Sequence, residues 1–314
     1  MPETVTCNLC GADGARRLYS MPDHRFWVDD EEWSVVECSG CGLGYLNPRP
    51  TRSEIRRYYP AAYYGLRAQL AAQYQRQASY MPEQSGRLLE IGAARGDFLE
   101  LMRQRGWDVA GIEPSTDAEN PYELPIHRGS FPDTSPFDSD TFDVITAWAV
   151  FEHLHDPAGA FAECARLLRP GGLLLLQVPN FRSLQSHWAA REDVPRHLYF
   201  YDASTLARYG ALSGLRLESV IHTTDFGGGG RGLLCVAFAR AIGRSTVDVF
   251  RLYSVPRGER FRRWPVFAST CTAVSLLERI VLSDRLIAGS RLSGQLVAYF
   301  GKPSLNGRVE LARA

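Results

Sequence analysis

Four cysteines in the first 41 residues have the spacing of a metal site. Cys7 and Cys10 form one C-x2-C pair, Cys38 and Cys41 form a second, and 27 residues separate the two pairs. Each such turn presents two sulfurs to one ion, and four thiolates are a ligand set that tetrahedral zinc favours. Four unrelated thiols or a redox role are the alternatives, but neither pair opens the helix of a βαβ unit, where redox pairs lie. With no coordination position open, the zinc would be structural.

A second group of residues that could bind a ligand lies in the segment 88–99, which reads LLEIGAARGDFL. An apolar strand ends in Glu90-x-Gly92, and a loop of small residues leads through Gly96 into a helix. Small residues let a cofactor lie against the backbone, and a helix N-terminus offers amide donors. The next apolar strand ends in Glu113, where a carboxylate is placed to accept both ribose hydroxyls of a nucleoside. The segment therefore predicts a site for a nucleoside-containing cofactor.

The spacing within this loop argues against a dinucleotide. A dinucleotide fingerprint needs G-x-G-x-x-G, whose middle glycine lets the pyrophosphate approach, and this chain has Ala94 at that place. The carboxylate of Glu90 would also repel a pyrophosphate, whereas it suits the ammonium group of a methionine moiety. The chain also lacks a Tyr-x-x-x-Lys pair, because Ala298 stands four residues before Lys302, its only lysine.

The elements that must position these residues follow from the pattern of apolar runs. Short apolar runs alternate with helical patterns between residues 86 and about 225, which is typical of βαβ units on a parallel sheet. We expect strands over 87–91, 107–113, 125–128, 142–147, 173–178, 215–221 and 295–300. The expected fold is α/β, with a Rossmann-like core of seven strands.

The chain divides into three expected parts. Residues 1–50 form a small zinc-binding module that ends in Asn47-Pro48-Arg49-Pro50, and residues 51–85 form a helical connector or lid rich in tyrosine. Residues 86–314 form the core domain, with a helical cap at about 231–292 inserted before the last strand. Apolar residues at helical spacing over 272–287 indicate that the cap covers the substrate pocket or a partner subunit. The alternative is that this segment makes peripheral contact with a membrane or a lipid-linked substrate.

Five motifs, in order along residues 86–180, resemble the class I methyltransferases that use S-adenosylmethionine (SAM). They are the acidic-x-Gly loop, Glu113, the strand 142–145, Phe151-Glu152-His153-Leu154, and Leu168-Arg169-Pro170-Gly171-Gly172. The cysteine module with its tyrosine-rich connector is similar to a subgroup that includes sugar C-methyltransferases and enzymes of surface-polysaccharide or secondary metabolism. The resemblance implies SAM as cofactor, S-adenosylhomocysteine as product and a structural zinc.

The resemblance also implies which residues contact the cofactor. Glu113 binds the ribose, Ser130 and Phe131 stand where the family holds the adenine, and Tyr64 belongs to the lid. The remaining residues of the expected cofactor site line the methionine and ribose side or open the helix after the loop: Glu90, Gly92, Ala93, Gly96, Asp97, Phe98, Ala147 and Trp148.

Three histidines follow strands whose loops would meet the cofactor. A base is required only when the methyl acceptor must lose a proton. His197, in an Arg-His-x-x-Phe stretch typical of the family, is the favoured base, against the alternative that it only orders its loop. We expect a structural role for His153, with a catalytic role as the alternative. Glu152 is expected to bind the cofactor or cap the loop. His155 is expected to be exposed.

Composition excludes several classes of function. Basic and acidic residues balance at 35 each, which argues against a nucleic-acid partner, and the apolar runs are too short for a membrane span. The N-terminus lacks a signal-peptide pattern, so a cytoplasmic location is expected. Both a monomer and a homodimer fit.

The sequence therefore predicts SAM-dependent methyl transfer to a small or carrier-linked acceptor, such as a sugar or another polyhydroxylated or secondary metabolite. Both oxygen and carbon are candidates for the methylated atom. An NAD-dependent oxidoreductase and a non-catalytic binding protein with a zinc module are the alternatives.

Overall fold

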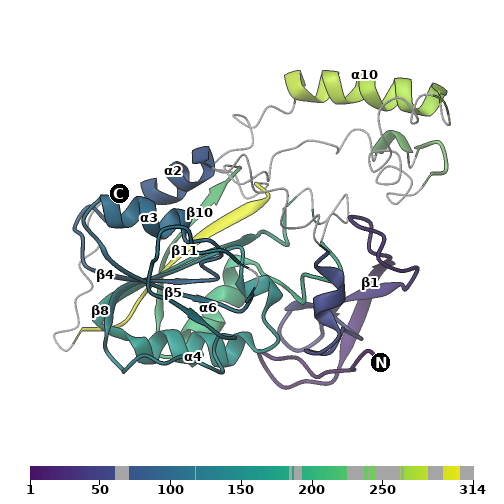
Figure 1. Cartoon of the computed structure of the whole chain (residues 1–314). Coiled ribbons are helices and arrows are strands. Elements are labelled where there is room, and N and C mark those ends of the chain that lie inside the picture. Colours follow the sequence, from purple (N-terminus) through teal and green to yellow (C-terminus); the bar gives the residue numbers. More distant parts are fainter. Residues whose placement is uncertain are drawn as a thin grey trace.

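The computed structural model describes residues 1–60, 71–116, 118–183, 186, 193–224, 237–239, 241–244, 262, 265–281 and 293–304. Two sheets organise the described chain (Figure 1). The larger has seven strands: β4 (Arg87–Ile91), β5 (Asp108–Glu113), β6 (Ile126–Arg128), β7 (Phe142–Trp148), β8 (Leu168–Pro179), β10 (Arg216–Thr223) and β11 (Gln295–Gly301).

The order of strands in the large sheet is β10-β11-β8-β7-β4-β5-β6. The pairs from β8 to β6 are parallel, whereas β11 runs antiparallel to both β8 and β10. All seven expected strands are confirmed, within a Rossmann-like α/β core. The chain order reverses at β4, whose parallel neighbours are β5 on one side and β7 on the other. The loops after these three strands therefore lie at one carboxyl edge, where ligands bind in open α/β sheets.

Helices cover both faces of this sheet because its strands are apolar on both sides. On one face α2 (Ala71–Ser79) and α3 (Asp97–Gln104) enclose a core with Leu88, Val109 and Val144. On the other face α4 (Pro157–Leu167) and α6 (Ala203–Leu212) pack on Leu89 and Ile145. Neighbouring residues of a strand thus face opposite cores, as Figure 1 shows for the two helix layers.

The N-terminal part forms the second, antiparallel sheet, of β1 (Ala15–Met21), β2 (Trp33–Cys38) and β3 (Gly44–Leu46). Its fourth strand is β9 (Tyr199–Phe200), which comes from the chain after β8 and pairs with β3. The expected module at residues 1–50 is therefore not self-contained, because the core domain supplies its last strand. Its apolar side chains also join the same core as α4 and α6.

The connector and the C-terminal part are described in pieces. In the connector, η1 (Ile55–Tyr58) and α2 are helical, and residues 61–70 lie outside the described chain. A further 3-10 turn, η3 (Phe151–His153), follows β7. Of the expected cap at 231–292, α10 (Pro265–Val281) is the long described helix, and Figure 1 shows it apart from the seven-stranded sheet. The expected helix over 272–287 thus begins earlier, and residues 282–287 lie outside the described chain.

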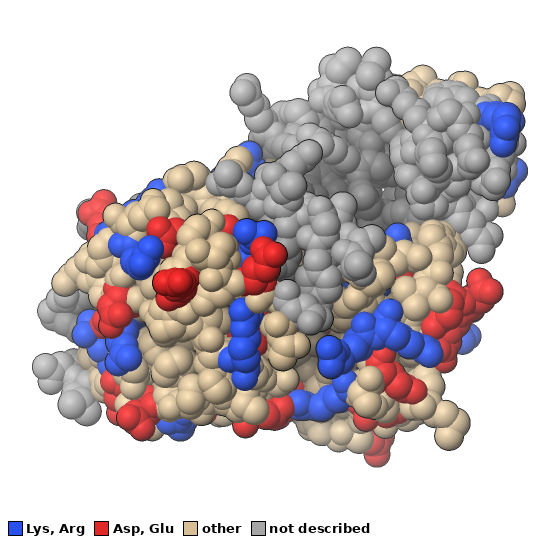
Figure 2. Space-filling view, in the orientation of Figure 1, with Lys and Arg blue, Asp and Glu red and all other residues tan. Residues whose placement is uncertain are grey.

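Two surface properties bear on partners. Among the described residues, no helix is both long and apolar enough to span a membrane. Acidic and basic side chains are interspersed over the described part of the face in Figure 2. A broad basic surface of the kind that binds nucleic acid is not seen on that part of this face.

Candidate functional site

The loop after β4 turns too tightly to carry side chains at its glycines. Gly92 has φ +75°, and a Cβ there would lie 2.6 Å from Cγ2 of Val150, in the loop after β7. Gly96, at the N-cap of α3, has φ +84°, and a Cβ there would lie 2.7 Å from Cδ1 of Leu124. The side chains of Val150 and Leu124 fill the space beside the two glycines, so only glycine lets the loop turn this closely against them.

Glu113 ends β5 and holds the same loop in place. Its Oε2 accepts a hydrogen bond from the amide of Ala94 at 2.9 Å, and its Oε1 accepts one from the amide of Ser115 at 2.9 Å. Each carboxylate oxygen can accept more than one hydrogen bond. The side chain is thus fixed at the carboxyl edge of the sheet and retains capacity to accept from hydroxyl groups.

The expected methionine side of the site consists of strand ends. Glu90, at 5% exposure, is a buried carboxylate near the end of β4, and Ala93 is buried behind the loop. Ala147 and Trp148 end β7, the strand that pairs with β4. The ring of Phe98 meets the Trp148 indole edge-on with centroids 5.4 Å apart. The structure therefore brings these expected residues of β4, β7 and α3 together.

Other expected cofactor residues are engaged elsewhere. Oδ1 of Asp97 accepts a hydrogen bond from the Tyr122 hydroxyl at 2.8 Å, which ties α3 to the loop before β6. Ser130 is exposed, and the Phe131 ring is buried in the core that includes α4 and α6. Their contacts with adenine stay predictions. Tyr64 lies outside the described residues.

Glu152, His153 and His197 form a cluster at this edge of the sheet. One ligand atom from each lies within 4.8 Å of the others, and the two imidazole rings meet edge-on with centroids 4.8 Å apart. The amide of Leu198 donates to the Glu152 carbonyl at 2.7 Å, so the loop after β8 is bonded to the turn after β7. Two imidazoles and a carboxylate can move a proton between them and a bound acceptor.

The tautomer of His153 follows from its neighbours. Its Nδ1 lies 2.9 Å from the carbonyl oxygen of Arg196, which only accepts, so Nδ1 carries the proton. The hydroxyl of Tyr59 lies 3.0 Å from the same nitrogen. Burial, assisted by charge on His197, lowers the pKa of His153 to about 3. His153 therefore stays neutral near pH 7, with the lone pair on Nε2.

A buried arginine beside His197 was not predicted from the sequence. Arg196 is fully buried, and its guanidinium donates to both carboxylate oxygens of Asp23, at 2.7 and 3.1 Å. It also donates to Oδ1 of Asp193, at 2.6 and 2.9 Å, and to the Tyr58 carbonyl at 3.0 Å. Asp23 follows β1, so this network joins the N-terminal part to the His197 loop. The Arg-His motif marked His197 but gave no signal for the distant aspartate.

Two further sequence predictions were tested in this region. His155 is half-buried rather than exposed, because Arg49 donates to its carbonyl and its ring bonds the Pro50 carbonyl at 3.1 Å. Burial lowers its pKa. In the segment expected to be a connector or lid, Tyr58 packs edge-on against Trp33 with centroids 5.7 Å apart, so this residue lies in the seam with the N-terminal sheet.

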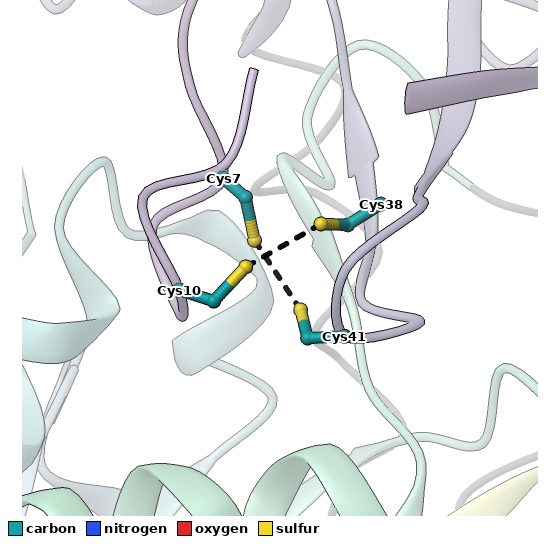
Figure 3. Close-up of side chains that lie close together, drawn as sticks. All are labelled: Cys7, Cys10, Cys38 and Cys41. Atoms are coloured by element: carbon teal, nitrogen blue, oxygen red, sulfur yellow. Dashed lines mark hydrogen bonds between the residues drawn. The ribbon is translucent and has the colours of Figure 1, made fainter. Parts of the chain in front are cut away.

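The four expected metal-ligating cysteines converge from two loops (Figure 3). The sulfurs of Cys7 and Cys41 lie 3.4 Å apart, and those of Cys10 and Cys38 lie 3.5 Å apart. Tetrahedral zinc with Zn–S bonds of about 2.3 Å separates its sulfurs by about 3.8 Å. The four sulfurs lie within 4.8 Å of one another, so their spacing suits one zinc ion.

A family model described as "Methyltransferase domain" matches residues 63–220, half of the chain. The chain is 29% identical over 155 residues to a protein named ubiquinone biosynthesis O-methyltransferase of Aromatoleum aromaticum, covering 43% of this chain and 66% of that protein. The protein of the same name from Alkalilimnicola ehrlichii is 32% identical over 103 residues, covering 30% of this chain and 42% of that protein. The chain thus spans less than two thirds of either relative.

Solved structures support the fold. A chain from the complex between the Haloferax volcanii Trm112 methyltransferase activator and a methyltransferase superposes with a TM-score of 0.50 at 16% identity. The match covers 79% of this chain and 97% of that chain. At this identity the likeness concerns the arrangement of strands and helices alone.

The cysteine cluster predicts the metal content of the protein. We expect about one zinc per chain by plasma emission spectrometry, and its loss together with a lower melting temperature in Cys38→Ser. The matched control is Cys164→Ser, a buried thiol in α4 outside the cluster. Wild-type protein without zinc, or Cys38→Ser protein that keeps it, would contradict the assignment.

The lowered pKa of His153 predicts acid lability. The folded protein resists protonation of this ring until about pH 3, whereas the unfolded chain takes up the proton near pH 6.5. The unfolded state therefore binds more protons below pH 6.5, and the free energy of unfolding falls as pH falls. We expect up to about 1.4 kcal/mol per pH unit from this residue.

Urea denaturation between pH 7.5 and 4.5 measures this slope. His153→Gln should show a shallower decline than the wild-type chain over the same range. Equal slopes in the two proteins would show that His153 contributes nothing to it.

Proposed function

The chain belongs to the methyltransferase domain family, and from that premise we propose that it is a SAM-dependent methyltransferase acting on a hydroxyl-bearing small or carrier-linked acceptor. The acceptor class is a sugar or another polyhydroxylated or secondary metabolite, and oxygen is the favoured methylated atom. The cluster of Glu152, His153 and His197 carries the proposal, because such a group suits an acceptor that must lose a proton. The two relatives are named as ubiquinone biosynthesis O-methyltransferases, which supports oxygen as the methylated atom.

The cofactor end of the proposal rests on the loop after β4. Glu113 binds the ribose hydroxyls, since its carboxylate is already fixed between the amides of Ala94 and Ser115. Glu90 would hold the methionine ammonium, since it is a buried carboxylate near the end of β4. SAM supplies an electrophilic methyl group when it is bound. Val150 links the two halves of the site, because it touches Gly92 and stands two residues before Glu152.

His197 is the base in this proposal. It takes the proton from the acceptor hydroxyl as that oxygen forms its bond to the methyl carbon, and the electron pair of the broken carbon–sulfur bond stays on sulfur. Neutral His153 and the carboxylate of Glu152 position the acceptor through hydrogen bonds, since Nε2 of His153 accepts. Much of the remaining rate enhancement comes from alignment of acceptor, methyl and sulfur.

The four cysteines hold a structural zinc in the same proposal. Thiolates would take all four coordination positions of the ion, which leaves none for a water or an acceptor. The metal fixes the two loops around Cys7–Cys10 and Cys38–Cys41, and its role in catalysis is indirect.

Loss of the Glu113 charge should weaken cofactor binding. Hydrogen bonds to a charged group contribute about 1.5–3 kcal/mol, so Glu113→Gln should bind S-adenosylhomocysteine about 10- to 100-fold more weakly by calorimetry. Glu163→Gln, which alters a carboxylate paired with Arg166 on α4, is the matched control and should bind as the wild-type chain does. Unchanged affinity in Glu113→Gln would remove Glu113 from the site.

Loss of the base should slow transfer without loss of cofactor. With tritiated SAM and a panel of sugar nucleotides, free polyols and phenols, His197→Gln should reduce turnover at least about 100-fold. Its affinity for S-adenosylhomocysteine should stay within about twofold of wild type. A His197→Gln protein with full turnover on the acceptor that the wild type uses would refute the base role, and methyl recovered on carbon would overturn the assignment to oxygen.

A further inference from the structure

We infer that Asp193 and Arg25 set the protonation of His197, and that their effects on it are opposite in sign. Both lie outside the reacting groups: Asp193 is on the same loop as His197, and Arg25 belongs to the N-terminal part. The inference rests on the proposed function, because it concerns the residue assigned there as base. It gives the N-terminal part an electrostatic role in the site, beyond the structural role of its zinc cluster.

The first observation is the place of Asp193. It stands four residues before His197, and its carbonyl accepts a hydrogen bond from the His197 amide at 2.8 Å. From within this turn the charges of the Asp193 carboxylate and the His197 ring act on each other. Burial alone would raise the pKa of Asp193, but charges on His197, Arg196 and Arg25 lower it below its ordinary value. Asp193 is therefore an anion near pH 7, and its charge favours the protonated form of the histidine.

The second observation is that each oxygen of this carboxylate has its own cation. Oδ1 accepts from the buried Arg196, whose charge is already shared with Asp23. Oδ2 accepts from Nη1 of Arg25 at 2.6 Å. Arg25 has a half-exposed side chain and lies two residues after Asp23, in the segment between β1 and β2. The N-terminal part thus supplies one cation that neutralises the anion beside His197.

Within the part of the chain that the structure describes, the titratable and charged groups around His197 come from four segments. His153 and Glu152 face it from η3, and Tyr59 reaches His153 from the connector. Asp193 and Arg196 lie on its own loop. Asp23 and Arg25 come from the N-terminal part. His153 stays neutral near pH 7, and Glu152 belongs to the reacting cluster itself. The charge balance between Asp193 and its two arginines is therefore what can be altered outside that cluster.

The two positions therefore predict opposite effects. Without the carboxylate, Arg25 loses this partner and Arg196 keeps only Asp23, so the positive charge near the ring is less compensated and His197 should hold its proton less well. Without Arg25, the carboxylate is less neutralised, so His197 should hold its proton better. A merely structural role of either residue would give no such pair of opposite shifts.

The test is a pH titration of the histidine resonances by NMR in full-length zinc-loaded protein with ¹³C-labelled histidine. The chain has seven histidines, and His197 is identified by the resonance that His197→Gln lacks. In Asp193→Asn the titration midpoint of His197 should fall by about one pH unit or more. In Arg25→Gln it should rise by a few tenths, since the half-exposed guanidinium is partly screened.

Arg16→Gln is the matched control, because Arg16 lies on β1 of the same part and pairs with Glu37, outside the network. It should leave the midpoint of His197 unchanged. Midpoints of His197 that agree with wild type in both Asp193→Asn and Arg25→Gln, or that move in the same direction in both, would overturn the inference. Arg25→Gln keeps the buried pair of Arg196 and Asp23, so one readout remains even if Asp193→Asn fails to fold.

This readout needs no acceptor, so its failure is separate from that of the proposed function. Full turnover in His197→Gln would refute the base role while the opposite shifts could still be observed. Wild-type midpoints in both variants would refute the electrostatic inference while His197 remained the base.

Discussion

The buried pairing of Arg196 with Asp23 and Asp193 is the constraint on which the arrangement of the site depends. Its guanidinium is fully buried and satisfied by two carboxylates and the Tyr58 carbonyl. Removing one partner of such a pair costs about 3–5 kcal/mol, because a buried charge is left uncompensated. Three segments far apart in sequence must therefore meet at this point, and His197 follows Arg196 directly.

A second set of hydrogen bonds joins the N-terminal part to the core domain. Asn8, between the first two cysteines, donates to the Asp156 carboxylate that caps α4, and its Oδ1 accepts from the Ala158 amide and the Tyr209 hydroxyl. The first cysteine loop is thus docked on α4 and α6. Strand β9 completes the N-terminal sheet between the two joints. Asn8 stands between Cys7 and Cys10, so the loop that carries these two cysteines is connected to α4 by the hydrogen bonds of Asn8.

The core of the fold could be predicted because its signals are local. Each strand of the large sheet is an apolar run bounded by turn residues, and the Glu90–Gly96 loop and Glu113 are read from short segments. The C-x2-C spacing of the cysteine pairs is likewise recognised within each pair. These features need no knowledge of which distant segments meet.

The joints between parts could not be predicted for the same reason. Arg196 and Asp23 are 173 residues apart, and neither stands in a pattern that indicates a partner. Strand β9 has only two residues, too few for a periodic signal. His155 was expected to be exposed because Asp-Pro follows it, yet the seam with Arg49 and Pro50 half-buries it. The long-range polar contacts that position the histidines therefore could not be predicted from the sequence.

The most direct test of the account is a crystal structure of the zinc-loaded protein with S-adenosylhomocysteine. The account predicts the ribose hydroxyls on the carboxylate of Glu113 and the sulfur facing the cluster of Glu152, His153 and His197, with room for an acceptor between them. A sulfur atom turned away from these residues, or a ribose held elsewhere, would contradict the claim that the cofactor loop and the histidine cluster form one site.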